Sequence, residues 1–181
     1  DGLVYVMANA LMLADDFGTP IALSGYAFTD RDAGALLQPG GRVLPQRCDA
    51  AAVEAALAGV ETLPAGARTC VHAWPAMLGM VEWRRVAGDA VRLPGVDADS
   101  AYGFEREGRA VIAANPDDGA TTLRGPTSLP DGRYCDVIAT GQRIGAAGDC
   151  GDSIVVVGGG EAVFDLAPWQ TMAIHQLSPA P

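Results

Sequence analysis

The sequence predicts a protein in two parts, an α/β segment followed by an all-β segment of the antiparallel Greek-key sandwich type. In the first part, an apolar helix-forming run leads through a tight turn into a short apolar run, an order typical of α/β folds. In the second part, short strand-forming runs alternate with Asn, Asp, Pro and Gly, which indicates antiparallel strands joined by turns. The character of the chain changes between Leu93 and Ala98.

The first part contains three predicted helices and one predicted strand. Leu3–Ala14 is apolar on nearly every side, so we expect a helix that is buried on several faces. Ile21–Phe28 is short and apolar throughout, which predicts a fully buried strand of a parallel sheet. Two further helices are predicted: a short one over Asp49–Leu57, with Asp49 as its N-cap, and a longer one over Ala76–Val86.

The second part is predicted to consist of short strands separated by turns. One turn, Gly158-Gly159-Gly160, precedes a strand-like run rather than a helix, so we expect a hairpin turn there and not a phosphate-binding loop. The predicted strands are Ala101–Phe104, Arg109–Ala114, Thr121–Leu123, Tyr134–Ile138, Ile154–Val157, Ala162–Leu166 and Thr171–His175.

Charge and hydropathy exclude several classes of partner. The 181 residues carry a net charge of −10, and a surface of that sign repels phosphates, so we expect neither nucleic acid nor an anionic membrane as a partner. No apolar run approaches the roughly 20 residues of a membrane span. The chain starts without a basic or apolar leader, so we expect that any export signal is absent or was removed before this numbering.

The four cysteines predict two disulfides. Cys48, Cys70, Cys135 and Cys150 form no close Cys-x-x-Cys pair of the kind that binds zinc or works as a redox centre. Sequential pairing, Cys48 with Cys70 and Cys135 with Cys150, is preferred because each pair flanks one local excursion of the chain. Disulfides persist in oxidising compartments, so we expect a secreted, extracellular protein.

Three stretches, in this order, resemble secreted α-amylases. Residues 8–28, ANALMLADDFGTPIALSGYAF, look like the last helix-to-strand step of the α-amylase (β/α)8 barrel. Residues 70–85, CVHAWPAMLGMVEWRR, look like the entry into its eighth helix, and residues 129–141, LPDGRYCDVIATG, look like the C-terminal domain of the family. The resemblance implies that residues 1–96 are the end of the catalytic barrel and residues 97–181 a C-terminal sandwich. We expect Asp97–Pro181 to fold alone and Asp1–Val86 not to.

The resemblance also implies a function for the parent protein. An α-amylase hydrolyses internal α-1,4-glucosidic bonds of starch with retention, which takes two carboxyl groups roughly 5–5.5 Å apart. The family places these groups, and an Asn-His-Asp motif, upstream of the helix that starts near Asp1. Neither His72 nor His175 lies in such a motif, so we expect no catalytic residue in this chain and no activity from the chain alone. Calcium is expected to bind the parent through residues outside this segment. Chloride activation is not expected, because Ile21 occupies the position of the basic ligand.

The remaining candidate residues each have a structural alternative that we prefer. Asp30, Arg31 and Asp32 would lie on the active-site face of the barrel and contact sugar hydroxyls, although a solvated loop explains them as well. Asp15-Asp16 offers too few ligands for a metal site and is interpreted as a helix end. His72 beside Trp74 is interpreted as a packed histidine next to a buried indole.

A second function class remains open, a stand-alone carbohydrate-binding or interaction module without hydrolase activity. Trp83 and Trp169 would then be sugar-stacking platforms, if they are exposed, whereas core packing is the alternative for both. The expected partner, through the parent enzyme, is starch or a maltooligosaccharide. The protein is expected to be a monomer.

Overall fold

The computed structural model describes residues 2–45, 47–49, 51, 63, 65–141 and 150–180. They form two compact units. One unit consists of Asp1–Pro20 together with Pro75–Pro181, and the other of Ile21–Trp74. The predicted domain boundary between residues 96 and 97 concerns independent folding and stays a prediction.

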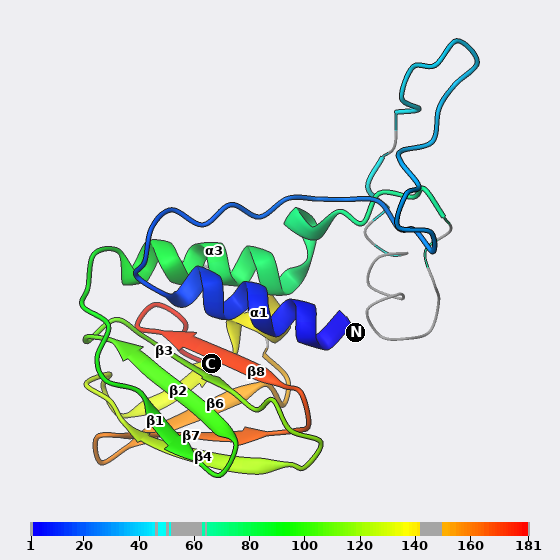
Figure 1. The fold of residues 1–181 in the computed structure, drawn as a ribbon. Helices are drawn as coiled ribbons and strands as arrows, with labels where there is room; N and C mark the ends of the chain where they lie inside the picture. The colour runs from blue at the N-terminus through cyan, green and yellow to red at the C-terminus, as the bar shows by residue number, and fades with distance from the viewer. Residues whose placement is uncertain are drawn as a thin grey trace. The chain divides into compact units, whose positions relative to one another are not determined.

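The first unit contains a sandwich of two four-stranded sheets (Figure 1), as predicted. Every strand pairing in the described residues is antiparallel. In the second sheet the order β4-β7-β6-β5 is a Greek key, because three consecutive strands lie beside a fourth that is reached by a crossing connection. The first sheet consists of β1 (Val96–Ala98), β2 (Ala101–Arg106), β3 (Ala110–Ala114) and β8 (Thr171–His175), and the second of β4 (Thr121–Pro126), β7 (Glu161–Leu166), β6 (Ile154–Gly158) and β5 (Gly132–Cys135).

One predicted strand is half wrong. Tyr134–Ile138 was expected to be extended, but β5 ends at Cys135 and a short helix, α4 (Val137–Thr140), follows. Asp136 between them is the N-cap, and its side chain accepts a hydrogen bond from the amide of Ile138 at 3.0 Å. Gly141 closes the helix in the left-handed conformation, with φ at 61°. The two caps therefore select a helix over a strand in a sequence of β-branched residues.

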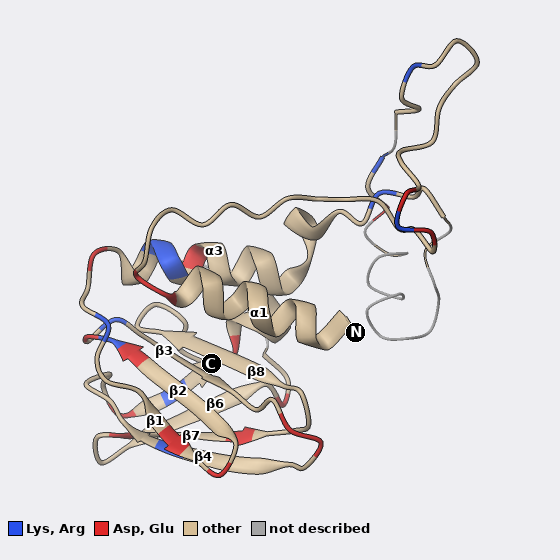
Figure 2. Cartoon of the chain, viewed as in Figure 1, with Lys and Arg blue, Asp and Glu red and all other residues tan. Residues whose placement is uncertain are grey.

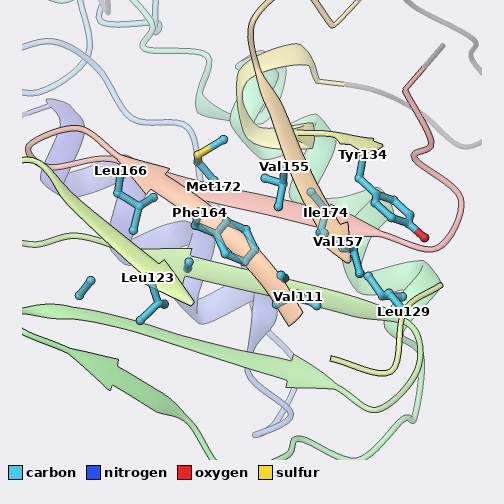
Figure 3. Packing of buried hydrophobic residues seen from close by; sticks show 13 residues of the cluster. Val111, Leu123, Leu129, Tyr134, Val155, Val157, Phe164, Leu166, Met172 and Ile174 are labelled. Carbon is cyan, nitrogen blue, oxygen red and sulfur yellow. The ribbon is translucent and has the colours of Figure 1, made fainter. Parts of the chain in front are cut away.

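The two sheets enclose an apolar core, shown as sticks in Figure 3. Phe164 of β7 points between the sheets, and Val111 of β3 and Ile174 of β8 approach it from the other side. These side chains come from alternate positions of their strands, as the two-residue period of a strand requires. The full cluster is Ala101, Val111, Ala113, Leu123, Leu129, Tyr134, Val155, Val157, Ala162, Phe164, Leu166, Met172 and Ile174.

Two longer helices cover the outer face of β3 and β8. They are α1 (Gly2–Ala14) and α3 (Pro75–Ala87), and both confirm the predicted helices. Trp83 of α3 is fully buried, and its indole nitrogen donates to the carbonyl oxygens of Val111 at 3.3 Å and Ile174 at 2.9 Å. One indole thus joins α3 to both strands. Since helices lie on one face and the core on the other, β3 and β8 are buried along their whole length.

Helix α3 approaches α4 closely at Gly79. A Cβ atom added to Gly79 would lie 1.8 Å from the carbonyl oxygen of Val137, so only glycine fits this contact. Helix α1, by contrast, departs from its prediction. Leu3, Val4 and Tyr5 are 58%, 47% and 43% exposed, so among the described residues this helix buries one face and not several.

Two arginines hold the C-terminal ends of these helices. Arg84 donates to the carbonyl oxygens of Leu13, Asp15 and Gly18, at 2.9, 2.5 and 2.9 Å. Arg106 of β2 is 2% exposed and donates to the carbonyl oxygens of Ala14, Gly88 and Ala90, at 3.1, 2.9 and 2.7 Å. The last carbonyls of a helix carry partial negative charge, so cations there stabilise it. Arg84 therefore joins α3 to the end of α1, and Arg106 joins the ends of both helices to β2.

The predicted strand at Ile21–Phe28, in the second unit, is not formed. Among the described residues of this unit, the backbone pairs only through isolated bridges, Tyr26 with Arg68 and Leu37 with Val43. Ile21 and Leu23 are each 74% exposed. A buried parallel strand needs hydrogen-bonded neighbours on both edges and cover on both faces, and the described residues supply neither. The helix predicted at Asp49–Leu57 lies mostly outside the described residues.

Both predicted disulfides are present. Cys48 is bonded to Cys70 and Cys135 to Cys150, with Cα atoms 5.6 and 5.4 Å apart. These separations are usual for a disulfide. The second bridge closes a loop over a sequence separation of 15 residues, which restricts the unfolded chain and contributes about 3 kcal/mol on a chain-entropy account. It links the last residue of β5 to the segment before β6.

Candidate functional site

The acidic turn proposed for sugar contacts is exposed and bonded mainly to itself. The side chain of Asp30 accepts a hydrogen bond from the amide of Asp32 at 3.0 Å, as in an Asx-turn. Arg31 pairs with Asp32 at 3.9 Å, and both side chains are almost fully exposed. A pair of this kind contributes little to stability. The structure places these three residues on a solvated turn, and their contact with substrate stays a prediction.

The histidine and tryptophan of the second unit are held by different bonds. Trp74 is buried, and its indole nitrogen donates to the carbonyl of Thr69 at 2.8 Å. His72 is exposed, which contradicts the predicted packed histidine. Its Nδ1 lies 2.6 Å from the hydroxyl oxygen of Ser24, and its Nε2 lies 4.0 Å from Sγ of Cys48. The exposed ring is thus oriented by a hydroxyl group and stands beside the disulfide.

A cavity of about 500 Å³ opens between the two sheets of the sandwich. Its size lies within the roughly 300–1,000 Å³ range of small-molecule sites. Glycines on both sides keep it open: Gly103 in β2 and Gly125 in β4 bring no side chain into it. The apolar side chains that line it are those of Leu93, Pro94, Val96, Phe104, Val111, Ile112, Leu123, Pro126 and Phe164.

The carboxyl group at the wall of this cavity is already satisfied. Glu105 is 4% exposed, and its oxygens accept hydrogen bonds from the hydroxyl and amide of Ser128, at 2.5 and 3.0 Å, and from the amide of Gly108, at 2.7 Å. A carboxylate held by three donors fastens the loop after β4 to β2. Its known partners lie in the protein itself, and most of the other side chains that line the cavity are apolar.

Two buried titratable groups lie on the helix-covered side of the first sheet, and neither was predicted. Burial raises the pKa of Asp136 to about 7, against the opposing effect of hydrogen bonds from the amides of Ala173, Ile138 and Ala139. Burial lowers the pKa of His175 to about 4, although Glu82 of α3 acts in the other direction. The sequence signal for Asp136 was an Asp five residues before a Gly, which marks the two caps of a short helix. His175 gave no signal.

The acidic pair Asp15-Asp16 lies at the end of α1. Asp15 binds the amide of Phe17 at 2.9 Å through its side chain, as expected at a helix end. Within the described ranges, no group of three or more His, Cys, Asp or Glu side chains is arranged to hold a metal ion. No helix in the same ranges is long and apolar enough to cross a membrane.

Of the two tryptophans considered as sugar-stacking platforms, only Trp169 has an accessible side chain. Trp83 is fully buried between α3 and the first sheet, so it packs in the core. Trp169 is half-buried, in the turn before β8. Its indole nitrogen donates to the side chain of Asp118 at 2.7 Å.

Comparisons with known proteins agree on one family. Residues 96–176 match the α-amylase C-terminal all-β domain. The α-amylase of Streptomyces violaceus is 35% identical over 138 residues, which cover 76% of this chain and 21% of that protein. The α-amylase of Tenebrio molitor is 33% identical over 177 residues, covering 94% of this chain and 34% of the relative. The chain therefore spans between a fifth and about a third of these relatives.

The similarity extends to three dimensions. The crystal structure of α-amylase I from Eisenia fetida superposes with a TM-score of 0.73 and 28% identity, over 94% of this chain and 35% of that one. A mutant of the same enzyme, described as a maltohexaose complex, superposes with the same TM-score. The match includes the helices as well as the sandwich, because it covers nearly the whole chain.

Proposed function

Because the chain corresponds to the C-terminal portion of an α-amylase, including its all-β C-terminal domain, we propose that its parent hydrolyses internal α-1,4-glucosidic bonds of starch and related glucans with retention. The observation that carries this proposal is the similarity in sequence and fold over 94% of the chain. Starch or a maltooligosaccharide is the proposed substrate, supported by the maltohexaose complex of the Eisenia fetida enzyme.

In this proposal the segment completes the catalytic barrel and carries the appended domain. The apolar face of α1, made by Leu3, Val4, Tyr5 and Met12, supports that role, since these side chains are between 37% and 58% exposed. Figure 2 shows α1 without charged residues along its length. An uncharged, exposed apolar face of this size marks an interaction surface. We assign it to the remaining barrel elements of the parent, whose residues would replace water there.

The catalytic carboxyl groups and calcium ligands are assigned to other parts of the parent. Calcium, which takes six to eight oxygen ligands, is proposed to bind the parent through residues outside this segment, as the resemblance implies. Chloride activation is not proposed, because Ile21 is apolar at the position where the resemblance puts a basic ligand. Secretion is proposed on the strength of the two disulfides.

The test compares the 181-residue chain with the complete product of its gene. With amylose as substrate, we expect the complete protein to release reducing ends, with the α-anomer as the first product seen by proton NMR. The purified chain is expected to release none. Turnover by the chain alone, or a β-anomeric first product from the complete protein, would contradict the proposal.

A further inference from the structure

The cavity between the two sheets has a buried floor and an exposed mouth. Its volume is about 500 Å³, and the side chains of Val111, Leu123 and Phe164 at its floor are between 2% and 6% exposed (Figure 3). Pro94, before β1, and Pro126, at the end of β4, also line the cavity and are exposed. A small molecule that enters between these two segments therefore reaches the apolar core of the sandwich directly.

Three backbone amides and one hydroxyl group near this mouth have partners within the protein. The amide of Leu93 donates to the carbonyl oxygen of Glu105 at 2.9 Å. The amide of Thr127 donates to the carbonyl oxygen of Gly160 at 2.8 Å. Both the amide and the hydroxyl of Ser128 donate to the carboxyl group of Glu105. The two prolines of the mouth have no N–H group, so a ligand is offered few hydrogen bonds there and must bind through its apolar surface.

The charge of the lining is that of a single carboxyl group. Among the described residues that line the cavity, only Glu105 has an ionisable side chain, and it accepts hydrogen bonds from Ser128 and from the amide of Gly108. A second anion close to it would be repelled strongly, because the surroundings have a low dielectric constant. Charge complementarity therefore disfavours fatty acids and other anions and favours uncharged molecules.

Water gains little in a cavity of this kind. A water molecule needs two to four polar partners, and the amide and hydroxyl donors at the mouth are already bonded within the protein. An apolar group that displaces weakly held water increases affinity, and the burial of its surface drives binding. An uncharged ligand with an apolar body therefore matches both the polarity and the charge of the lining.

We propose that this cavity binds an uncharged aliphatic small molecule. Its hydrocarbon chain would lie against Leu123 and Phe164 between the sheets, and its polar end would stay in water at the mouth. Binding of this kind adds to the hydrolysis proposed for the parent and does not depend on it.

The test is a fluorescence titration of the 181-residue chain with N-phenyl-1-naphthylamine, an uncharged probe that becomes bright in apolar surroundings. We expect saturable binding in about the micromolar range. In competition, 1-decanol should displace the probe. Decanoate has a chain of the same length but carries a carboxylate, so it should displace the probe about tenfold more weakly because Glu105 repels it.

Two glycine-to-leucine variants in the second sheet give a matched comparison. Gly125 of β4 lies two residues after Leu123 and therefore on the core side, and a Cβ added to it would meet Val96 at 3.6 Å. Gly125→Leu should fill part of the cavity, lower probe affinity by about tenfold and leave the Tm equal or higher. Gly158→Leu, on the exposed end of β6 with no atom within 4 Å of its Cβ, should leave affinity unchanged. If Gly125→Leu does not fold, Gly125→Ala should still weaken binding by about threefold.

The outcomes separate this cavity from other apolar surfaces of the chain. Equal probe affinity in the wild type and a folded Gly125 variant would overturn the proposal, because the probe would then be bound elsewhere, as on the exposed face of α1. The absence of saturable binding would also overturn it, and so would equal displacement by decanol and decanoate. A Tm that rises with decanol in the wild type and in Gly158→Leu, but not in Gly125→Leu, would support it. A Tm of the wild type that falls with decanol would contradict it.

Discussion

The two sheets of the sandwich share one core but differ on their outer faces. In β3 and β8 every residue is buried, because α1 and α3 cover the face that the core leaves open. In β6 and β7 of the other sheet, buried residues alternate with exposed or half-exposed ones. The sandwich therefore contains one sheet that is buried on both faces and one that is buried on a single face. The difference arises because helices pack on the outer face of the first sheet, and not from how the strands pair.

The sequences of the strands reflect this difference. Strand β3 contains Ala110, Ile112 and Ala114 on the helix side, and β8 contains Thr171, Ala173 and His175 there, so alanine occupies half of the positions that face the helices and none carries an acidic side chain. Strand β7, by contrast, places Glu161 and Asp165 outward. Small residues let the helices come close, and charged residues keep a face in water.

The largest loss of stability is expected from a substitution at Trp83, which joins α3 to the first sheet. Trp83→Ala removes a fully buried indole and its two hydrogen bonds to the first sheet, so we expect a loss of about 3–5 kcal/mol in the free energy of unfolding. Val156→Ala, at a position of β6 that is 51% exposed, should cost less than about 1 kcal/mol. Urea unfolding of both variants provides the measurement. Equal losses would show that the helices do not stabilise the first sheet.

A smaller effect is expected from glycines in the two sheets. In Gly103→Ala of β2, the new Cβ would lie 2.7 Å from Leu123 and 2.8 Å from the carbonyl oxygen of Ile112, so we expect a loss of about 1–3 kcal/mol. In Gly125→Ala of β4, the new Cβ would meet Val96 at an ordinary 3.6 Å, and the change should be neutral or slightly stabilising. Thermal melts of the Gly103→Ala and Gly125→Ala variants provide the measurement. A lower Tm for Gly125→Ala would contradict the free space that the cavity offers beside Gly125.

The last expected effect is a pH dependence from two buried groups on the helix-covered side, whose contributions partly cancel in the wild type. The folded pKa of Asp136, about 7, is above its unfolded value of 3.8, so its contribution to stability is complete below pH 3.8 and is lost as pH rises through 7. The folded pKa of His175, about 4, is below 6.5, so its contribution is complete above pH 6.5 and is lost as pH falls through 4. Between pH 4 and 6.5 the two slopes oppose each other.

Replacing either Asp136 or His175 should reveal the pH dependence that the other residue contributes. In Asp136→Asn, the free energy of unfolding is expected to rise with pH between 4 and 6.5, relative to the wild type, by up to about 1.4 kcal/mol per pH unit. His175→Asn should show the opposite slope. Urea unfolding at four pH values in this window gives both slopes, and parallel curves for the variants and the wild type would refute the assignment.

The positions of the strands along the chain were predictable, because turn residues and the alternation of apolar and polar residues are local signals. Seven predicted strands correspond to β2 to β8, and both disulfides have the sequential pairing that was preferred. The strand expected at Ile21–Phe28 failed, since an apolar run becomes a strand only beside partners. The end of Tyr134–Ile138 failed because the caps at Asp136 and Gly141 outweigh β-branched residues.

The sequence by itself predicted the all-β sandwich, the helices at α1 and α3, a preference for sequential disulfides and the resemblance to α-amylases, because these depend on periodicity, spacing and motif order. Only the tertiary structure decided which tryptophan is buried, that His175 and Asp136 are enclosed, and that residues of β2 and β4 share a cavity. Burial and proximity arise when segments distant in sequence pack together, and no local pattern records which neighbours a side chain will have.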